Sequence, residues 1–172
     1  MSCFWVPSDE ARFGRMNRIR PCWAPVRTRP EVAAQLIREY IYLYGAVSPK
    51  DGTCVYLIMP TSNTACFQAF LDVLARRFVR QDLLVLDGAP NHRSSELVLP
   101  DNITLLYLPP YSPELNPKEN LWDEIGEKIF KNYALKSMDA VRAKLKQAIL
   151  YIERNPKIVR SITSFPYIVN SI

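Results

Sequence analysis

Two aspartates follow apolar runs that are typical of buried strands. Asp87 closes the run LLVLD and is followed by GAP, and Asp9 stands at the end of CFWVPSD. A carboxylate at the end of a core strand costs free energy unless it is hydrogen-bonded, paired with a cation or bound to a metal. Asp87 therefore belongs either to a site that binds a cation or to a turn that it caps with its own side chain, and the sequence leaves both roles open.

Glu10 directly follows Asp9 and competes with it for a role in any site. Successive side chains of a strand point to opposite faces of the sheet. Only one of the two acids can then belong to a site where several acids converge, and we choose Asp9.

A third acid, Glu119, falls in the first turn of a predicted helix behind the proline-rich segment LPPYSPELNP. With Asn116 as N-cap and Pro117 in the first helical position, Glu119 occupies the third position, where it can bond back to the backbone in a capping box. Helical spacing also puts Glu119 at the border of an apolar stripe, from where a carboxylate can reach the end of a sheet. Asp123 lies one turn further on and is a rival for that place. The stripe comprises Leu121, Trp122, Ile125 and Ile129.

The segment between residues 11 and 30 carries six arginines and no acid: Arg12, Arg15, Arg18, Arg20, Arg27 and Arg29. Arginine favours bidentate contacts to phosphate, and the interleaved Phe13 and Trp23 offer surfaces on which bases stack. We therefore predict a DNA-contacting segment, with a solvated basic loop as the alternative. His92 stands five residues after Asp87 and is a further candidate for a DNA phosphate contact. Contact with a site carboxylate, or hydrogen bonds within the loop, are the alternative roles for this histidine.

The elements that must position these residues follow from hydrophobic periodicity. We predict a short first strand ending at Asp9, a basic loop, and a hairpin over residues 39–59 that turns at PKDG. A helix over 63–79 follows, then two strands, LLVLD and NITLLYLP, each covered on both faces. Helices after Asn116 and over 137–152 complete the chain. This order predicts an α/β domain with a mixed sheet and helices packed on it.

The composition places limits on the class of protein. The chain has 172 residues, which suits one domain, and 48% of them are hydrophobic and 23% charged. No apolar run is long enough to span a membrane, and the N-terminus lacks the pattern of a signal peptide, so we expect a cytoplasmic, nucleoid-associated protein. The four cysteines form no CxxC pair and there is one histidine, which argues against a zinc site.

Four motifs together resemble a known family. PSDEARFGR, RPCWAP, LVLDGAPNH and LPPYSPELNPKENLW are similar to the catalytic domain of DDE transposases, in particular the bacterial insertion-sequence relatives of the mariner transposases, from about Phe4 to Ile149. The resemblance implies a ribonuclease H-like fold with a mixed five-stranded sheet and helices on both faces. It also implies one DDE catalytic domain over residues 1–172. Since only eight residues precede Asp9, we expect the helix-turn-helix modules common in the family to be absent.

By motif, the resemblance assigns catalysis and metal binding to Asp9, Asp87 and Glu119, and it disfavours Glu10, Glu114 and Asp123. Such a trio suits Mg²⁺, with Mn²⁺ as a substitute, in a pair of ions that serves DNA cleavage and strand transfer. The implied partner is double-stranded DNA, bound by a homodimer or together with an upstream-encoded DNA-binding subunit. The alternatives are a nuclease or resolvase of the same fold that cuts without joining, and a non-catalytic DNA-binding remnant.

Overall fold

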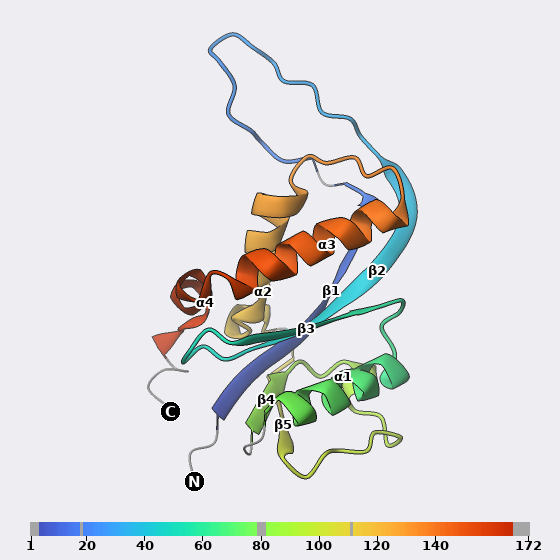
Figure 1. Ribbon diagram of the computed structural model, residues 1–172, viewed down its shortest axis with the longest axis vertical. Helices are drawn as coiled ribbons and strands as arrows, with labels where there is room; N and C mark the ends of the chain where they lie inside the picture. Colours follow the sequence, from blue (N-terminus) through green and yellow to red (C-terminus); the bar gives the residue numbers. More distant parts are fainter. Residues whose placement is uncertain (1–3, 18, 79–81, 111, 167–172) are drawn as a thin grey trace.

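The computed structural model describes residues 4–17, 19–78, 82–110 and 112–166 and has a five-stranded mixed sheet at its centre (Figure 1). The strands lie in the order β3-β2-β1-β4-β5. β2 pairs antiparallel with β1 and β3, whereas β4 pairs parallel with β1 and β5. The strands are β1 (Phe4–Met16), β2 (Leu36–Val47), β3 (Cys54–Met59), β4 (Asp82–Leu86) and β5 (Ile103–Tyr107).

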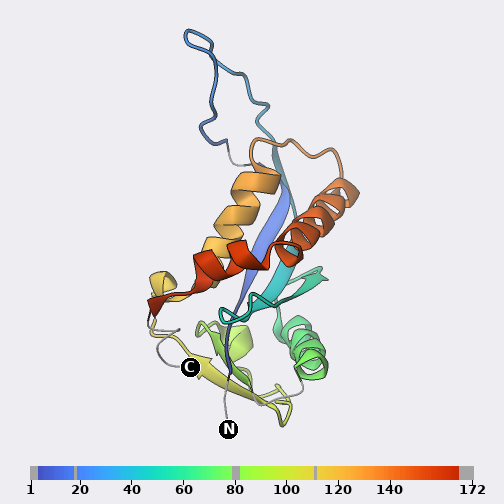
Figure 2. The same cartoon turned by 60° about the vertical axis from the view of Figure 1, so that its left-hand side comes forward.

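Helices cover both faces of this sheet, as Figures 1 and 2 show. One face carries α1 (Thr64–Arg77), and the other carries α2 (Lys118–Ile125), α3 (Met138–Glu153) and α4 (Pro156–Thr163). α2 continues as the π-helical turn η3 (Gly126–Phe130), and two 3₁₀ turns, η1 (Pro90–His92) and η2 (Pro113–Leu115), lie in the loops. None of the helices in the described ranges combines the length and apolar character needed to cross a membrane. The predicted fold, a mixed five-stranded sheet with helices on both faces, is confirmed.

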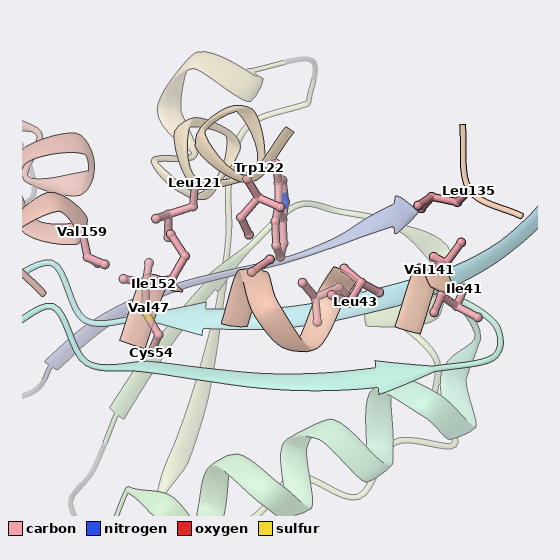
Figure 3. Close-up of a cluster of buried hydrophobic side chains, with 13 residues drawn as sticks. Ile41, Leu43, Val47, Cys54, Leu121, Trp122, Leu135, Val141, Ile152 and Val159 are labelled. Atoms are coloured by element: carbon pink, nitrogen blue, oxygen red, sulfur yellow. The ribbon is translucent and has the colours of Figure 1, made fainter. Parts of the chain in front are cut away.

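The alternation of side chains along β2 separates two hydrophobic cores. Ile41, Leu43 and Val47 belong to the core under α2, α3 and α4. Tyr44 and Ala46 belong to the core under α1. Figure 3 shows Leu121 and Trp122 of α2 directed toward β2 in the first of these cores. Burying α2 in this way fixes where its first turn lies relative to the sheet.

The first strand differs from its prediction. We expected it to end at Asp9, but β1 continues to Met16 because β2 pairs with it from Ser8 onward, after the parallel pairing with β4 has ended at Pro7. Arg12 and Arg15 therefore belong to a strand and not to the predicted basic loop.

Two further expectations are corrected at the end of the sheet and of the chain. β5 is an edge strand whose burial alternates, so only one of its faces is covered. α4 was not predicted, because its eight residues follow α3 after only Arg154 and Asn155 and give a short periodic signal. The hairpin, α1 and α3 lie where the sequence predicts them, and Asn63 and Ser137 cap the two helices with their side chains.

The chain between β1 and β2 forms a long arm that extends away from the sheet (Figures 1 and 2). We call residues 17–35 the arm; Arg18 lies outside the described residues. The base of the arm is fixed by hydrogen bonds, since Gln35 N donates to Asn17 Oδ1 and the side chain of Asn132 bonds both the N–H and the C=O of Arg20. The outer arm carries Trp23, which is fully exposed.

Candidate active site

Parallel pairing brings Asp9 and Asp87 to the same edge of the sheet. The last parallel pair of β1 and β4 joins Pro7 and Val85, and each aspartate lies two residues further along its own chain. β4 ends there, whereas β1 continues alongside β2, so Asp9 lies within a strand and Asp87 begins a loop. The two carboxylates are neighbours because of the sheet register, although 78 positions separate them in the sequence.

Glu119 reaches the same place from the first turn of α2. Asn116 caps this turn, since its Oδ1 accepts from Lys118 N at 3.1 Å and its C=O accepts from Glu119 N at 3.1 Å. Asn116 thus has the capping role that the sequence predicts for it, and the Glu119 carboxylate lines a cavity of about 450 Å³ together with Asp9 and Asp87. Asp123 is turned toward Arg20, with which it forms an ion pair at 3.6 Å.

Burial and mutual repulsion raise the pKa of two of these acids. Burial, and after it the charge of Glu119, raises the pKa of Asp9 to about 7, although Trp122 Nε1–H donates to Asp9 Oδ2 at 3.1 Å and Glu10 N–H donates to Oδ1 at 2.8 Å. Burial, followed by the charges of Asp123 and Asp87, raises the pKa of Glu119. The cavity therefore gathers carboxylates that repel one another, and a bound cation would relieve that repulsion.

Asp87 is held differently, through His92. The Nδ1–H of His92 donates to Asp87 Oδ1 at 2.8 Å, and Ala89 N–H donates to the same oxygen at 3.1 Å. The hydrogen bond from His92 lowers the pKa of Asp87 despite partial burial. Burial opposes the charge on His92, but its hydrogen bonds to Asp87 and Glu10 outweigh that effect and raise the pKa of His92 to about 9. Asp87 is therefore ionised at neutral pH and Asp9 is only partly so.

The donor set fits a hard divalent cation that shares its coordination with water and substrate. Asp9, Asp87 and Glu119 offer carboxylate oxygens, which are the ligands preferred by Mg²⁺ and Mn²⁺. Arg93, Ser112 and Asn116 also line the cavity. Within the described ranges, no three acidic, histidine or cysteine side chains stand close enough together to surround one ion. Mg²⁺ does not require such a set, because it commonly binds through one or two carboxylates and completes its octahedron with waters and phosphate oxygens.

A second cavity of about 400 Å³ adjoins the first and shares Asp9 and Glu119 with it. It runs along β1 past Arg12, Arg20 and Lys131 toward the base of the arm. Asp9 and Glu119 therefore lie where the two cavities meet, and the second cavity is lined by these three cations together with Glu10 and Asp123. Its cations could contact a phosphate backbone that passes the acids.

The arginines predicted to contact DNA take different positions. Arg12 lies over the ring of Tyr40 at 4.3 Å from its centroid, and Arg15 donates to Leu135 C=O at 3.1 Å and to Glu39. Arg20 pairs with Glu127 and Asp123, whereas Arg27 and Arg29 are exposed on the arm with Trp23. Arg15 and Arg20 thus connect the arm and β1 to the body, and the outer three residues are accessible to a ligand.

The structure places His92 away from the surface. Its side chain is 2% exposed and both ring nitrogens contact carboxylates, so no ring nitrogen is left for the phosphate contact that we predicted. His92 contacts Asp87, one of the predicted site acids, and is also a hydrogen-bonded loop histidine, so the structure is compatible with both of these roles.

Sequence reasoning missed several residues around the acids. Trp122 was assigned only to the apolar stripe, although its spacing of three from Glu119 puts its indole on the side of the helix that faces Asp9. Lys118 is fully buried under α2, with its Nζ over the rings of Tyr56 and Trp122. No sequence signal distinguishes this lysine from an exposed one.

Comparison with known proteins gives matches over most of the chain. The family model described as DDE superfamily endonuclease matches residues 5–142. An uncharacterized protein of Sinorhizobium fredii (strain NBRC 101917 / NGR234), y4pE/y4sA, is 40% identical over 101 residues, which cover 55% of this chain and 75% of that protein.

Solved structures of the Mos1 transposase have a similar fold. The Mos1 mariner paired end complex with Mn matches with a TM-score of 0.66 and 17% identity, covering 93% of this chain and 53% of that chain. The catalytic domain of Mos1 mariner transposase matches with a TM-score of 0.60 and 17% identity, covering 93% of this chain and 78% of that chain. This chain therefore spans about half the length of the transposase chain in the complex. At 17% identity, what the two chains are shown to share is the ribonuclease H-like fold.

Proposed function

The chain belongs to the DDE superfamily of endonucleases, and we propose that it is a transposase catalytic domain that cleaves DNA strands and transfers them to new positions with the help of a divalent metal ion. The observation that carries this proposal is the convergence of Asp9, Asp87 and Glu119 on one cavity from three elements far apart in the sequence. Asp87 also caps the turn that follows it, since its Oδ1 accepts from Ala89 N–H, but that turn role does not explain why three distant acids line one cavity.

Asp9, Asp87 and Glu119 would hold the metal, Mg²⁺ or in its place Mn²⁺, and we infer that it binds as a pair of ions. Metal bound there would activate a water or a DNA 3′-hydroxyl and stabilise the leaving oxygen. Trp122 and the backbone N–H of Glu10 orient Asp9, and His92 and the backbone N–H of Ala89 orient Asp87. Glu119 reaches the cavity from the first turn of α2.

The solved relatives support the choice of substrate and metal. The similar Mos1 structures are described as a strand transfer complex, a paired end complex with Mn and a paired end complex with Mg. We infer that this chain also acts on double-stranded DNA, and that it does so as a homodimer or with a separate DNA-binding subunit. We further infer that residues 1–172 form a single catalytic domain.

Substitution of Asp87 by asparagine tests the proposal. Asp87→Asn keeps the size of the side chain but removes a charge that binds metal, so we expect Mn²⁺-dependent nicking of a labelled duplex to fall to the level seen without metal. Asp101→Asn, in the exposed turn before β5, changes the net charge equally and should leave nicking unchanged. Both variants should unfold at the temperature of the wild type within a few degrees.

The same assay separates the proposed function from its alternatives. Joining of a 3′-hydroxyl end to a second duplex identifies a transposase, whereas nicking without joining identifies a nuclease or resolvase. Binding of DNA with no metal-dependent nicking at all would identify a non-catalytic remnant and would refute the catalytic proposal.

A further inference from the structure

Glu10, His92 and Asp87 form a continuous hydrogen-bonded bridge beneath the cavity. His92 lies between the two acids, with Nδ1 at 2.8 Å from Asp87 Oδ1 and Nε2 at 3.0 Å from Glu10 Oε2. Carboxylates can only accept hydrogen bonds, so both ring nitrogens carry hydrogens. The side chains of His92 and Glu10 are 2% and 13% exposed, whereas that of Asp87 is 58% exposed. The bridge thus begins in the interior and ends in the cavity.

The inner end of the bridge is fixed by several elements. Glu10 Oε1 accepts from Asn91 Nδ2 at 2.9 Å and from Ser62 Oγ at 2.8 Å, which leaves Oε2 for His92. The imidazole packs against the ring of Phe67 of α1 with centroids 4.4 Å apart. Tyr107 of β5 donates its hydroxyl hydrogen to His92 C=O at 2.7 Å. The ring therefore has little freedom to rotate or to move.

The outer end of the bridge determines which oxygen of Asp87 faces the cavity. Both hydrogen bonds that Asp87 accepts, from His92 and from Ala89 N–H, end on Oδ1. Oδ1 is thereby held toward the loop, and Oδ2 is left for a ligand in the cavity. A half-exposed aspartate without such partners would rotate about its side-chain bonds and would lose entropy on binding a metal.

We propose that Glu10 and His92 are positioning residues that fix Asp87 for metal binding, with His92 acting on Asp87 directly and Glu10 acting through His92. This inference rests on the proposed function, since it takes Asp87 as a metal ligand. It assigns Glu10 a role on the opposite face of the sheet from Asp9, where alternation along β1 places it. Outer partners of this kind typically change metal affinity by about 10- to 100-fold when they are removed.

The experiment measures Mn²⁺ binding by isothermal titration calorimetry on the purified chain without DNA. His92→Phe keeps a ring against Phe67 but removes both hydrogen bonds, and we expect Mn²⁺ to bind at least about tenfold more weakly. Glu10→Leu should weaken binding by about tenfold, whereas Glu10→Gln keeps an oxygen that accepts from His92 Nε2 and should remain within about threefold of the wild type.

Phe67→Leu serves as the control for a purely structural role. It removes the ring that packs on His92 and leaves the hydrogen-bonded bridge intact, so it should lower the unfolding temperature but weaken Mn²⁺ binding by less than about threefold. Across these variants, Mn²⁺ affinity would then change with loss of the hydrogen bonds of the bridge and not with the unfolding temperature.

Two results would overturn the inference in different ways. Wild-type affinity in His92→Phe, together with a large loss in Asp87→Asn, would show that Asp87 binds the metal without the bridge. Wild-type affinity in Asp87→Asn would overturn the proposed function itself, and the role of the bridge with it.

Discussion

The ionised form of Asp9 destabilises the folded chain. Its ordinary pKa is 3.8, and burial and the charge of Glu119 raise it to about 7 in the folded chain. Between these values the folded protein binds a proton more readily than the unfolded chain does, so stability falls as the pH rises through this window. Above pH 7 the ionised carboxylate remains an unfavourable group unless a cation binds beside it.

Asp9→Asn should therefore stabilise the metal-free protein. At pH 8 with a chelator present, we expect the free energy of unfolding to rise by about 3 kcal/mol, because the amide keeps an acceptor for Trp122 and carries no charge. At pH 4 the difference should shrink, since Asp9 is then protonated in the folded wild type. Urea unfolding at the two pH values checks this. Added Mn²⁺ should reverse the order, and an unchanged order would argue against metal binding by Asp9.

Lys118 is the second unusual residue beside the site. It is fully buried, its Nζ has no hydrogen-bond partner in the described part of the chain, and burial lowers its pKa to about 8. The rings of Tyr56 and Trp122 favour the ammonium ion, but desolvation of a charge costs several kcal/mol. Below pH 8 the charged form of Lys118 therefore lowers the free energy of unfolding.

Lys118→Met should raise the free energy of unfolding at pH 7 by about 1–2 kcal/mol, because Met fills a similar volume without a charge. The unfolded chain binds the lysine proton more tightly than the folded chain between pH 8 and 10.5, so the wild type gains stability as the pH rises through that window. The advantage of the variant should accordingly be smaller at pH 9.5, as measured by urea unfolding. A loss of stability at pH 7 would mean that the two aromatic rings outweigh desolvation.

At the residue scale, the sequence predicts the acids better than their surroundings. Asp9, Asp87 and Glu119 stand at boundaries that hydrophobic runs and proline mark locally, so pattern and motif suffice to select them. The role of His92 depends on Glu10, whose side chain reaches it across 82 positions, and no local pattern encodes that contact. The state of Lys118 depends likewise on the packing of α2 against β2 and β3.

At the scale of elements, the position of Glu119 depends on how closely α2 approaches the sheet. Gly45 of β2 pairs with Asp9 on one side and with Tyr56 on the other. A Cβ at this position would lie 2.5 Å from Lys118 Nζ and 2.8 Å from Tyr56 Cε1. The missing side chain thus makes room for the first turn of α2.

Gly45→Ala should therefore disturb the site as well as the core. We expect the free energy of unfolding to fall by about 1–3 kcal/mol and Mn²⁺ binding to weaken, because Lys118 must move and Glu119 is its neighbour in the helix. Gly126→Ala is the matched control, since an added Cβ there meets only Arg20 at 3.7 Å and the backbone is helical. Thermal unfolding and calorimetry on both variants check the prediction. Unaltered Mn²⁺ affinity in a destabilised Gly45→Ala would show that α2 does not set the site.

Element prediction succeeded where one local pattern dominates. The turn PKDG and the capping residues Asn63 and Ser137 mark boundaries by their own chemistry, and β2, α1 and α3 lie close to their predicted ranges. The end of β1 was misplaced because pairing with β2 sustains the strand beyond the acids, through residues that read locally as a basic loop. Tertiary pairing here overrides composition.

At the scale of the whole molecule, the acidic cavity and the arm are distinct in charge. The net charge of the chain is +5, yet the cavity gathers acids. The second cavity connects the two regions, because it runs from Asp9 and Glu119 past Arg12 and Arg20 to the base of the arm. A DNA strand that lies along it would place a phosphate at the acids and reach the exposed outer arm.

Neutralising the outer arm should weaken DNA binding through loss of phosphate contacts alone. Arg27→Gln with Arg29→Gln removes two exposed charges, so we expect the slope of log affinity against log salt concentration to become shallower by about 2. Fluorescence anisotropy with a labelled duplex between about 50 and 200 mM salt measures that slope.

Arg154→Gln with Arg160→Gln makes the same change in net charge at exposed positions around α4, outside the residues that line the two cavities. If DNA follows the path from the acids to the arm, the control slope stays at the wild-type value. Equal changes in both double variants would instead mean that the duplex responds to net charge, and the arm would lose its assigned role in binding.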